Sequence, residues 1–465
     1  MTTIVATEPQ APPSRKVFGH PRGLGVLALT ELWDRISFHG MQAVLVLFMV
    51  DQLLRPGHVE HIVGFAPFRA AVEGVTGPLS VQALASQIFG LYVGLVAASP
   101  MLGGWLGDRI LGRTRTVNLG AALMTAGHFC MAFDASFLLA LALLIVGAGC
   151  LRANLSPQLS ELYAPDDRRR EVAFQLYASM INLGAFIAPL ASGAMAQAWG
   201  WHAAFGFAGF GMLIGLVVYL AGRRDLPAVS ARAPGSGRAR LEPAERRIVW
   251  LLLLLVPVAS LFWIAQSQVW NTYNLWARDH IELRFGGWTM PVVWLQSLDG
   301  LAPFALLPPI LMLWRWQAKR GTEPDGFVKL AIGCLICAAG TAWLAAAGLV
   351  VDGSGRTPLI WAVTFHIVSN LGWLYFTPTA SALFTRCAPR SVNGVMIGAL
   401  SLSVTIGSLV SGRLGGLYER LDPAAFWLIH AALVAAGGLL FLVIGKSLGP
   451  RLYDVAPPVV AAAAI

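Results

Sequence analysis

The chain has 465 residues, of which 56% are hydrophobic and 12% are charged, and its formal net charge is +9. Soluble globular proteins carry about 25% charged residues, so this composition excludes an ordinary soluble domain and indicates a protein of the lipid bilayer. The excess basic residues lie in every second segment between the hydrophobic stretches. This alternation indicates how the chain is oriented in the membrane, and it accounts for the net charge without a nucleic-acid partner.

Long hydrophobic stretches recur along the chain, and each approaches the ~20 residues that a helix needs to cross a bilayer. We therefore predict an all-α integral membrane protein with twelve transmembrane helices, over residues 24–53, 83–106, 114–133, 136–158, 172–197, 203–222, 248–272, 289–314, 328–350, 358–383, 392–416 and 424–446. The predicted organisation is an N-terminal tail (1–23), a six-helix bundle (24–222), a linker (223–247), a second six-helix bundle (248–446) and a C-terminal tail (447–465). No apolar core with a small-residue cleavage site marks the tail, so no removable signal peptide is expected.

The lysines and arginines at the ends of the spans and between them divide 24 to 6 between the two sides of the membrane. The rich side includes both tails and the linker, and the poor side holds Arg55, Arg69, Arg278, Arg284, Arg356 and Arg420. Because cytoplasmic loops carry the excess of basic residues, we predict a multi-pass protein of the cell membrane with both termini in the cytoplasm. A bacterial inner membrane is the expected location.

The two bundles repeat each other in sequence. RANLSPQLSELY (152–163) aligns with WLYFTPTASALF (373–384), and LASG (190–193) aligns with LVSG (409–412). Two halves in the same orientation are the parallel repeat of the major facilitator architecture. In that architecture the substrate site lies near mid-membrane between the halves, and one half rocks against the other.

The loop GGWLGDRILGRTRT (103–116) resembles the loop signature of the major facilitator superfamily. Its acid is expected to approach helix N-termini of the other half, which would make the loop part of a gate. The alternative is a basic cytoplasmic loop with a tight turn. The gating residues predicted here are Gly107, Asp108, Arg109, Gly112 and Arg113.

The first span contains ELWDRISFHG, in which Glu31, Asp34 and Arg35 share one helix face and His39 follows one turn later. A charged group at mid-membrane costs ~2.5–3.5 kcal/mol on insertion scales, so each one calls for a reason. One acid remains after Arg35 is paired, and Arg152 in the fourth span supplies the balance. The alternative is a buried ion pair that only anchors helices.

Seven stretches resemble the proton-dependent oligopeptide transporter (POT) family. ELWDRISFHGMQA is similar to its first-helix signature, a Glu-x-x-Glu-Arg pattern. The stretches similar to its later spans are CLRANLSPQLSELYAPDD, FQLYASMINLGAFIAPL, WGWHAAFGFAGFGMLIGL, LFWIAQSQ, WLQSLDG and GWLYFTPTA. The resemblance covers nearly the whole chain and implies uptake of di- and tripeptides together with protons.

The chain departs from the family pattern at the residues that usually bind peptide and proton. The departures are Asp34 for a glutamate, Phe38 and His39 for a tyrosine pair, Gln42 for a basic residue, Ala97 and Ala178 for pocket tyrosines, Arg152 for a lysine, Ser267 and Trp373 for the glutamates of spans 7 and 10, and Asp299 for an asparagine. These changes indicate a pocket suited to a solute less zwitterionic than a plain peptide.

The resemblance and the buried charges together predict two groups of site residues. The proton-coupling group is Glu31, Asp34, His39 and Asp299. The substrate-binding group is Arg35, Phe38, Gln42, Arg152, Tyr177, Asn182, Trp263, Gln268, Asn274, Trp373 and Thr377. Arg35 is expected to bind a substrate carboxylate, with a purely structural ion pair as the alternative, and His39 either shuttles protons or only donates a hydrogen bond.

We hypothesise that Asp299 replaces the missing span-10 carboxylate, either by pairing with Arg152 or by binding a substrate cation. The alternative is an acid that caps a helix break before Gly300. The remaining buried histidines are expected to be core residues with satisfied hydrogen bonds: His128, His366 and His430.

The sequence as a whole predicts a secondary active transporter, with proton-coupled uptake of small peptides as the leading function. The alternatives are a permease or exporter of another small organic solute and a membrane sensor that does not transport. No cluster has metal-ligand or nucleophile spacing, so we expect no enzyme, no metal and no cofactor. The expected partners are the solute, protons and lipid, with no obligate protein partner.

Overall fold

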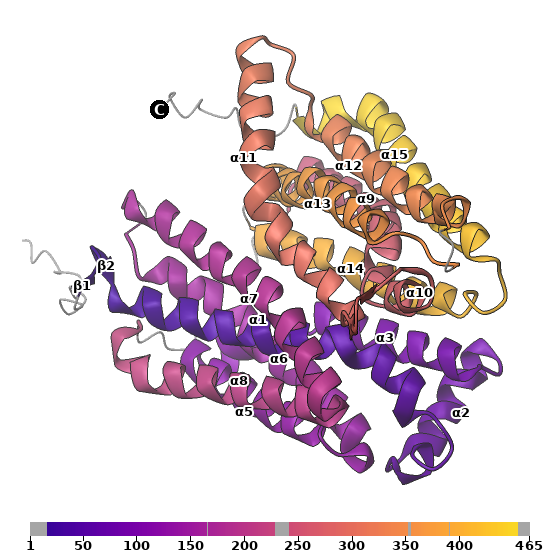
Figure 1. Cartoon of the computed structure of the whole chain (residues 1–465). Coiled ribbons are helices and arrows are strands. Elements are labelled where there is room, and N and C mark those ends of the chain that lie inside the picture. Colours follow the sequence, from indigo (N-terminus) through magenta and orange to yellow (C-terminus); the bar gives the residue numbers. More distant parts are fainter. Residues whose placement is uncertain (1–15, 165, 228–240, 352–354, 390, 454–465) are drawn as a thin grey trace, which may run out of the picture.

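The computed structural model describes residues 16–164, 166–227, 241–351, 355–389 and 391–453. Nearly all of the described chain is helical, and the helices form two bundles that lie side by side (Figure 1). The predicted all-α membrane architecture is therefore confirmed.

The N-terminal bundle begins with a small antiparallel hairpin, β1 (Lys16–Val17) and β2 (His20–Pro21), directly before the first helix. Its long helices are α1 (Arg22–Phe48), which runs on into a π-helical turn η1 (Met49–Leu53), α3 (Val81–Ala98), α5 (Arg113–Cys130), α6 (Phe137–Glu161), α7 (Arg169–Trp199) and α8 (Trp201–Gly222). The seven-residue helix α4 (Pro100–Leu106) follows α3 after Ser99. A short helix, α2 (Phe65–Thr76), lies between α1 and α3. The other short elements are η2 (Val59–His61), η3 (Gly107–Leu111), η4 (Asp134–Ser136) and η5 (Arg223–Asp225).

The C-terminal bundle begins at Pro243, where Glu242 and Glu245 form a reciprocal capping box. Its helices are α9 (Pro243–Gln268), α10 (Thr272–His280), α11 (Ser297–Lys319), α12 (Gly326–Ala345), α13 (Leu359–Cys387), α14 (Asn393–Gly415) and α15 (Pro423–Tyr453). A two-strand hairpin, β3 (Arg284–Phe285) and β4 (Trp288–Thr289), and the 3-10 turn η6 (Val292–Gln296) precede α11, and η7 (Ala346–Leu349) follows α12.

Eleven of the twelve predicted spans are long and apolar enough to cross a membrane in the described part of the chain. The remaining one, predicted over 114–133, is α5, which packs against α6 and α8 inside the bundle but is less apolar than the others. The twelve-span count is therefore approximate. Most of the predicted linker, residues 228–240, lies outside the described residues, and α9 begins five residues earlier than predicted.

The two bundles meet along two helix pairs, α3 with α14 and α7 with α11. Glycines allow these backbones to approach closely. A Cβ atom at Gly90 of α3 would lie 2.7 Å from the Cα atom of Gly412 on α14, and one at Gly300 of α11 would lie 2.2 Å from the backbone nitrogen of Phe186 on α7. Small residues at contacts of this kind drive helix association inside membranes.

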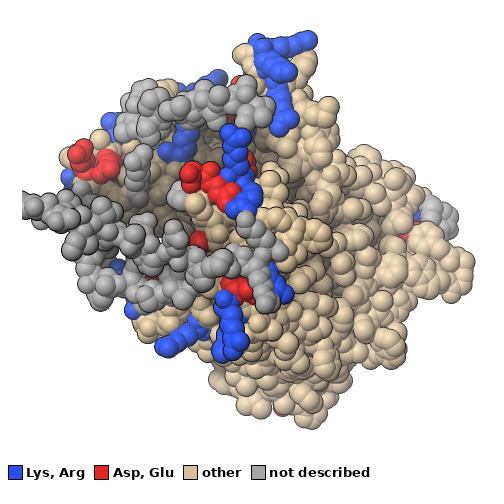
Figure 2. Space-filling model, turned by 90° about the vertical axis from the view of Figure 1, so that its left-hand side faces the viewer, with Lys and Arg blue, Asp and Glu red and all other residues tan. Residues whose placement is uncertain are grey.

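The bundles are joined at one end and diverge toward the other. We call the end where η1 lies the closed end, and the end where β1 and β2 lie the open end (Figure 1). Seen from the open end, the surface is hollowed between the bundles, and described lysine and arginine side chains surround the hollow (Figure 2).

Candidate functional site

A cavity of about 430 Å³ lies between the two bundles and is lined by both of them. Nine of the predicted site residues line it: Arg35, Phe38, His39, Gln42, Arg152, Asn182, Trp263, Asp299 and Trp373. Its wall is mostly apolar with a few placed polar groups, which is the usual character of a small-molecule site. Arg35 lies 13 residues beyond the start of α1, or on the order of 20 Å along the helix axis, so the cavity sits near the middle of the span.

Four charged side chains form a balanced cluster in the N-terminal wall. Arg35 donates from Nε to Oε1 of Glu31 at 2.7 Å, and Arg152 on α6 donates from Nε to Oδ2 of Asp34 at 3.1 Å. Asp34 also lies 3.6 Å from Arg35, which links the two pairs. The second oxygen of Glu31 accepts a hydrogen bond of 2.5 Å from the hydroxyl of Tyr177 on α7. Two acids and two guanidinium groups thus sum to zero charge.

The two arginines face the cavity while the two acids lie behind them. Glu31 and Asp34 are 1% and 0% exposed, whereas the side chains of Arg35 and Arg152 are 17% and 14% exposed. Neither arginine uses Nη1 in an ion pair within the described chain, and the Arg152 guanidinium lies 4.1 Å above the ring of Phe38. Each therefore keeps donors for a ligand, and its planar fork suits a carboxylate.

Asp299 lines the opposite wall, and its partners differ from those we expected. Its Oδ1 lies 2.8 Å from Nδ1 of His366 and accepts a hydrogen bond of 2.7 Å from Nδ2 of Asn370, both on α13. The predicted pair with Arg152 is not formed, because the Arg152 guanidinium is bound to Asp34. The carboxylate also binds side chains of another helix, which does not support the alternative of a local helix cap.

His366 was expected to be a core histidine with satisfied hydrogen bonds, and this expectation is wrong. Its Nδ1 contacts Asp299, and its buried Nε2 has no hydrogen-bond partner in the described chain. The same expectation is wrong for His128, which is buried and whose two ring nitrogens have no hydrogen-bond partner among the described residues. His430 does match the expectation, because it contacts Gln268 and the Phe426 carbonyl.

Several predicted pocket residues do not line this cavity. Gln268 is fully buried and donates to the Ser411 carbonyl, and Asn274 is fully buried and donates to the Ala43 carbonyl across the two bundles. The hydroxyl oxygen of Thr377 is buried without a partner in the described chain, away from the cavity lining. Tyr177 does not line the cavity either; its hydroxyl donates a hydrogen bond to Glu31. Gln268 and Asn274 thus have structural contacts in place of the predicted contact with substrate.

Other lining residues were missed at the sequence level. They include Gln266 and Trp270 on and after α9 and Asn370 on α13. Asn370 lies four residues after His366 and three before Trp373, so one helix face carries all three. That spacing was visible in the sequence and would have found Asn370.

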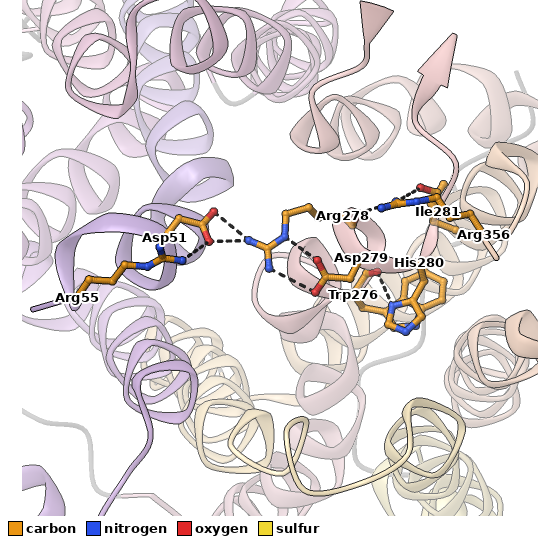
Figure 3. A network of polar contacts seen from close by, with 8 residues as sticks. All are labelled: Asp51, Arg55, Trp276, Arg278, Asp279, His280, Ile281 and Arg356. Carbon is orange, nitrogen blue, oxygen red and sulfur yellow. Dashed lines mark hydrogen bonds and ion pairs between the residues drawn. The ribbon is translucent and has the colours of Figure 1, made fainter. Parts of the chain in front are cut away.

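The closed end is held by polar contacts between the bundles (Figure 3). Arg278 on α10 donates to both oxygens of Asp51 on η1 at 2.7 and 2.9 Å, and it also donates to Asp279 at 2.8 Å. Arg356 donates to the carbonyls of Arg278 and Ile281, each at 3.0 Å, and so supports this turn of the C-terminal bundle.

Further contacts continue this seal between the bundles. They are Gln82 to the Gly415 carbonyl, Asn271 to Ser86, Gln197 to the Thr289 carbonyl and Trp294 to the Leu190 carbonyl, with donor–acceptor distances of 2.6–3.1 Å, and a contact between Ser80 and Glu419. Sequence patterns could not predict this set, because each contact joins residues more than 90 positions apart.

The predicted gating loop lies at the open end and makes its contacts within the N-terminal bundle. Arg113 contacts Asp108 at 3.1 Å and also contacts Glu161 at the end of α6. Gly112 has a φ of +74°, which glycine adopts without strain. A Cβ atom at Gly107 would lie 2.0 Å from Oδ1 of Asn154, so the loop is packed tightly on α6. Asp108 is bound to Arg113, whereas we expected it at helix N-termini of the other half.

Two bundles of membrane-spanning helices around one charged cavity, sealed at one end, define a transporter of the major facilitator type. The sequence matches the POT family over residues 114–232 and 232–428, and the chain therefore belongs to that family.

Characterised relatives and solved structures resemble the chain over nearly its whole length. It is 28% identical to the peptide transporter YePEPT of Yersinia enterocolitica subsp. palearctica, covering 94% of this chain and 96% of that one. It is 26% identical to a di-/tripeptide transporter of Lactococcus lactis subsp. cremoris, covering 94% and 98%. The fold is similar to a crystal structure of a peptide transporter POT in complex with sulfate, with a TM-score of 0.81, 26% identity and coverage of 94% and 97%.

Proposed function

We propose that this chain is a proton-coupled secondary transporter that takes up small peptides or peptide-like solutes by alternating access. Family membership supports the class of activity, since relatives along the whole chain are peptide transporters. The observation that carries the proposal is the cavity itself: it is shared by both bundles and presents two guanidinium groups with unused donors. The activity is transport and not enzymatic catalysis.

Arg35 and Arg152 bind the carboxylate end of the solute in this proposal. A guanidinium binds a carboxylate through two parallel hydrogen bonds, and both arginines face the cavity. Asn182 and Gln266 supply amide groups for a peptide bond, while Phe38, Trp263 and Trp373 enclose apolar side chains. Gln42 completes the N-terminal wall.

The proton is coupled to the solute through the same arginine. Glu31 holds Arg35 in an ion pair and accepts a hydrogen bond from Tyr177. A solute carboxylate that binds Arg35 competes with the carboxylate of Glu31. Protonation of Glu31 neutralises that carboxylate and breaks its ion pair with Arg35. Glu31 and Asp34 are thus the proton-coupling acids of the N-terminal wall, with His39 beside them and Asp299 on the other wall.

The open end faces the cytoplasm in this proposal. Basic residues gather on that face (Figure 2), and cytoplasmic loops are enriched in lysine and arginine. The structure then corresponds to an inward-open state, with both termini in the cytoplasm and the protein in the inner membrane of a bacterium. The ion pair between Asp51 and Arg278 belongs to the outer gate, and it separates when the bundles rock toward the outward-open state. Gly107, Asp108, Arg109, Gly112 and Arg113 form the inner gating loop.

Transport by purified protein in liposomes tests this proposal directly. An inwardly directed proton gradient should drive accumulation of labelled dialanine, and a protonophore should abolish it. Arg35→Ala should lose both accumulation and exchange, because the carboxylate contact is removed. Saturable binding of dialanine with no flux would instead indicate a sensor.

A second candidate is a permease for an organic acid that lacks a free amino group. Trp373 favours it, because an indole lines the cavity where a carboxylate would receive an amino terminus. Competition against dialanine by its N-acetyl derivative and by simple monocarboxylates separates the two candidates. If only the unmodified peptide competes, the organic-acid candidate is wrong.

A further inference from the structure

We propose that Asp299 and His366 form a proton-binding pair on the C-terminal wall of the cavity, and that this pair binds the coupling proton there. The inference rests on the proposed function and assigns the C-terminal bundle a site of its own. His366 on α13 is fully buried, and its Nδ1 lies 2.8 Å from Oδ1 of Asp299 on α11. Asn370 fixes the same oxygen at 2.7 Å and also donates to the His366 carbonyl at 2.8 Å, so the carboxylate and the ring are held in one geometry.

Two atoms of the pair have no partner in the described chain. They are Oδ2 of Asp299 and Nε2 of His366, and both are buried. Buried polar atoms are normally hydrogen-bonded, and exceptions call for an explanation. An acceptor beside a titratable ring, reachable from the cavity through the 14% exposed Asp299 side chain, is a place where a proton can bind.

Among the described residues, no lysine or arginine forms an ion pair with Asp299, whereas Asp34 on the other wall is paired with Arg152. The phenol of Tyr273 on α10 faces His366 with ring centroids 5.1 Å apart. Across the cavity stand Arg35, His39 and Arg152, and α7 presents the uncharged amide of Asn182.

A buried carboxylate without a cation is costly, so the imidazole is the group that can neutralise it. With one proton the pair is neutral, as carboxylate with imidazolium or as carboxylic acid with imidazole. Without that proton its charge is −1. In this proposal the two groups share one proton.

The position of Asp299 links proton binding to movement of the bundles. The next residue, Gly300, is wedged against α7, where an added Cβ atom would lie 2.6 Å from the backbone carbonyl carbon of Ala185. This contact joins the N-terminal and C-terminal bundles, so rocking changes the surroundings of Asp299. Occupancy of the pair and the orientation of the transporter are thus coupled through one turn of α11.

The test uses the full-length protein and the variants Asp299→Asn and His366→Gln, with His430→Gln as the matched control. His430 is an equally buried histidine of the same bundle, and both of its ring nitrogens have partners. The first measurement needs no solute. Infrared difference spectra between acidic and alkaline pH should show coupled carboxyl and imidazole bands. Each pair variant should lose them, and the control should keep them.

The second measurement is labelled dialanine flux in liposomes. Under a gradient of one pH unit, accumulation should fall about tenfold in the two pair variants, because one pH unit contributes about 1.36 kcal/mol per coupled proton, while exchange without a gradient persists. Bands that survive in the pair variants, accumulation that is unchanged, or a loss matched by His430→Gln would each overturn the pair. If the coupled bands behave as expected but wild type carries no dialanine, the pair stands as a proton site and the peptide-uptake proposal fails.

Discussion

The two walls of the cavity handle charge in different ways. The N-terminal wall holds four charged groups, and each acid has an arginine partner within 3.1 Å. Among the described lining residues, the C-terminal wall holds one acid, Asp299, which contacts a histidine and an amide, and the same wall carries the indoles of Trp263 and Trp373. Arginine remains charged at every physiological pH, whereas the charge of histidine depends on pH near neutrality.

This difference separates two tasks of a coupled carrier. Fixed guanidinium groups provide a permanent binding site for an anion. The described part of the C-terminal wall offers an imidazole and no lysine or arginine, so that wall is neutral or negative according to whether it holds a proton. Variants that alter one wall at a time should therefore differ in the size and kind of their effects.

Arg152→Ala should break the balance of the N-terminal wall most severely. The variant leaves Asp34, which is fully buried, with Arg35 at 3.6 Å as its remaining cation and removes the contact with Phe38. Breaking a buried ion pair costs about 3–5 kcal/mol. Thermal unfolding in detergent should show the loss, and Arg152→Lys should recover part of it. Equal unfolding temperatures for wild type and Arg152→Ala would contradict the buried pair.

Glu31→Gln should separate coupling from binding. The glutamine keeps the shape of the side chain but cannot gain or lose a proton, and Arg35 remains available for a carboxylate. Under a gradient of one pH unit, accumulation of dialanine should fall about tenfold, because one pH unit contributes about 1.36 kcal/mol per coupled proton, and exchange should continue. Accumulation that still follows the pH gradient would remove Glu31 from the coupling mechanism.

Trp373→Glu should make the C-terminal wall resemble the N-terminal one by adding a second acid. Its carboxylate can bind the free amino end of a peptide, and a hydrogen bond to a charged group contributes about 1.5–3 kcal/mol. The ratio of the Kd of N-acetyl dialanine to that of dialanine, measured by competition, should rise. Trp373→Gln has no charge and serves as the control; an equal rise in both variants would point to cavity volume as the cause.

Asp51→Asn should have the smallest effect, because the pair it forms with Arg278 is partly exposed. Exposed pairs contribute ~0.2–1 kcal/mol, so the population of the outward-open state should rise by a factor of roughly 1.4–5. Labelling of a cysteine placed at Ser86 reports that population. The gain should shrink at high salt because of screening, and Asp279→Asn, which keeps the Asp51–Arg278 contact, should show less change.

Hydropathy was sufficient to predict the spanning helices. A helix satisfies its own backbone hydrogen bonds inside a bilayer, and the ~20 residues that cross it are predominantly apolar. The stretch predicted over 114–133 is α5, which is less apolar than the other spanning helices because Arg113, Arg115 and His128 lie within it. α2 was not predicted, since a twelve-residue helix outside the membrane gives no spanning signal.

The N-terminal wall was predictable because three of its charged residues share one helical face in the first span. The C-terminal wall was less so. α9 is apolar around its whole circumference and ends at Gln268, so spacing alone did not show that Gln266 and Trp270 face the cavity while Gln268 does not. The contact of Asp299 with His366 joins two helices 67 residues apart, and helical periodicity carries no information across that distance.

The zero sum of Glu31, Asp34, Arg35 and Arg152 bears on how membrane voltage acts on the transport cycle. Moving one elementary charge across a membrane potential is worth about 2.3 kcal/mol per 100 mV. A self-neutralised wall adds no net charge to the moving parts, so the field acts on the proton, on the solute and on any unneutralised Asp299. In recordings of transport current, the step that carries the proton should therefore be the one whose rate follows voltage.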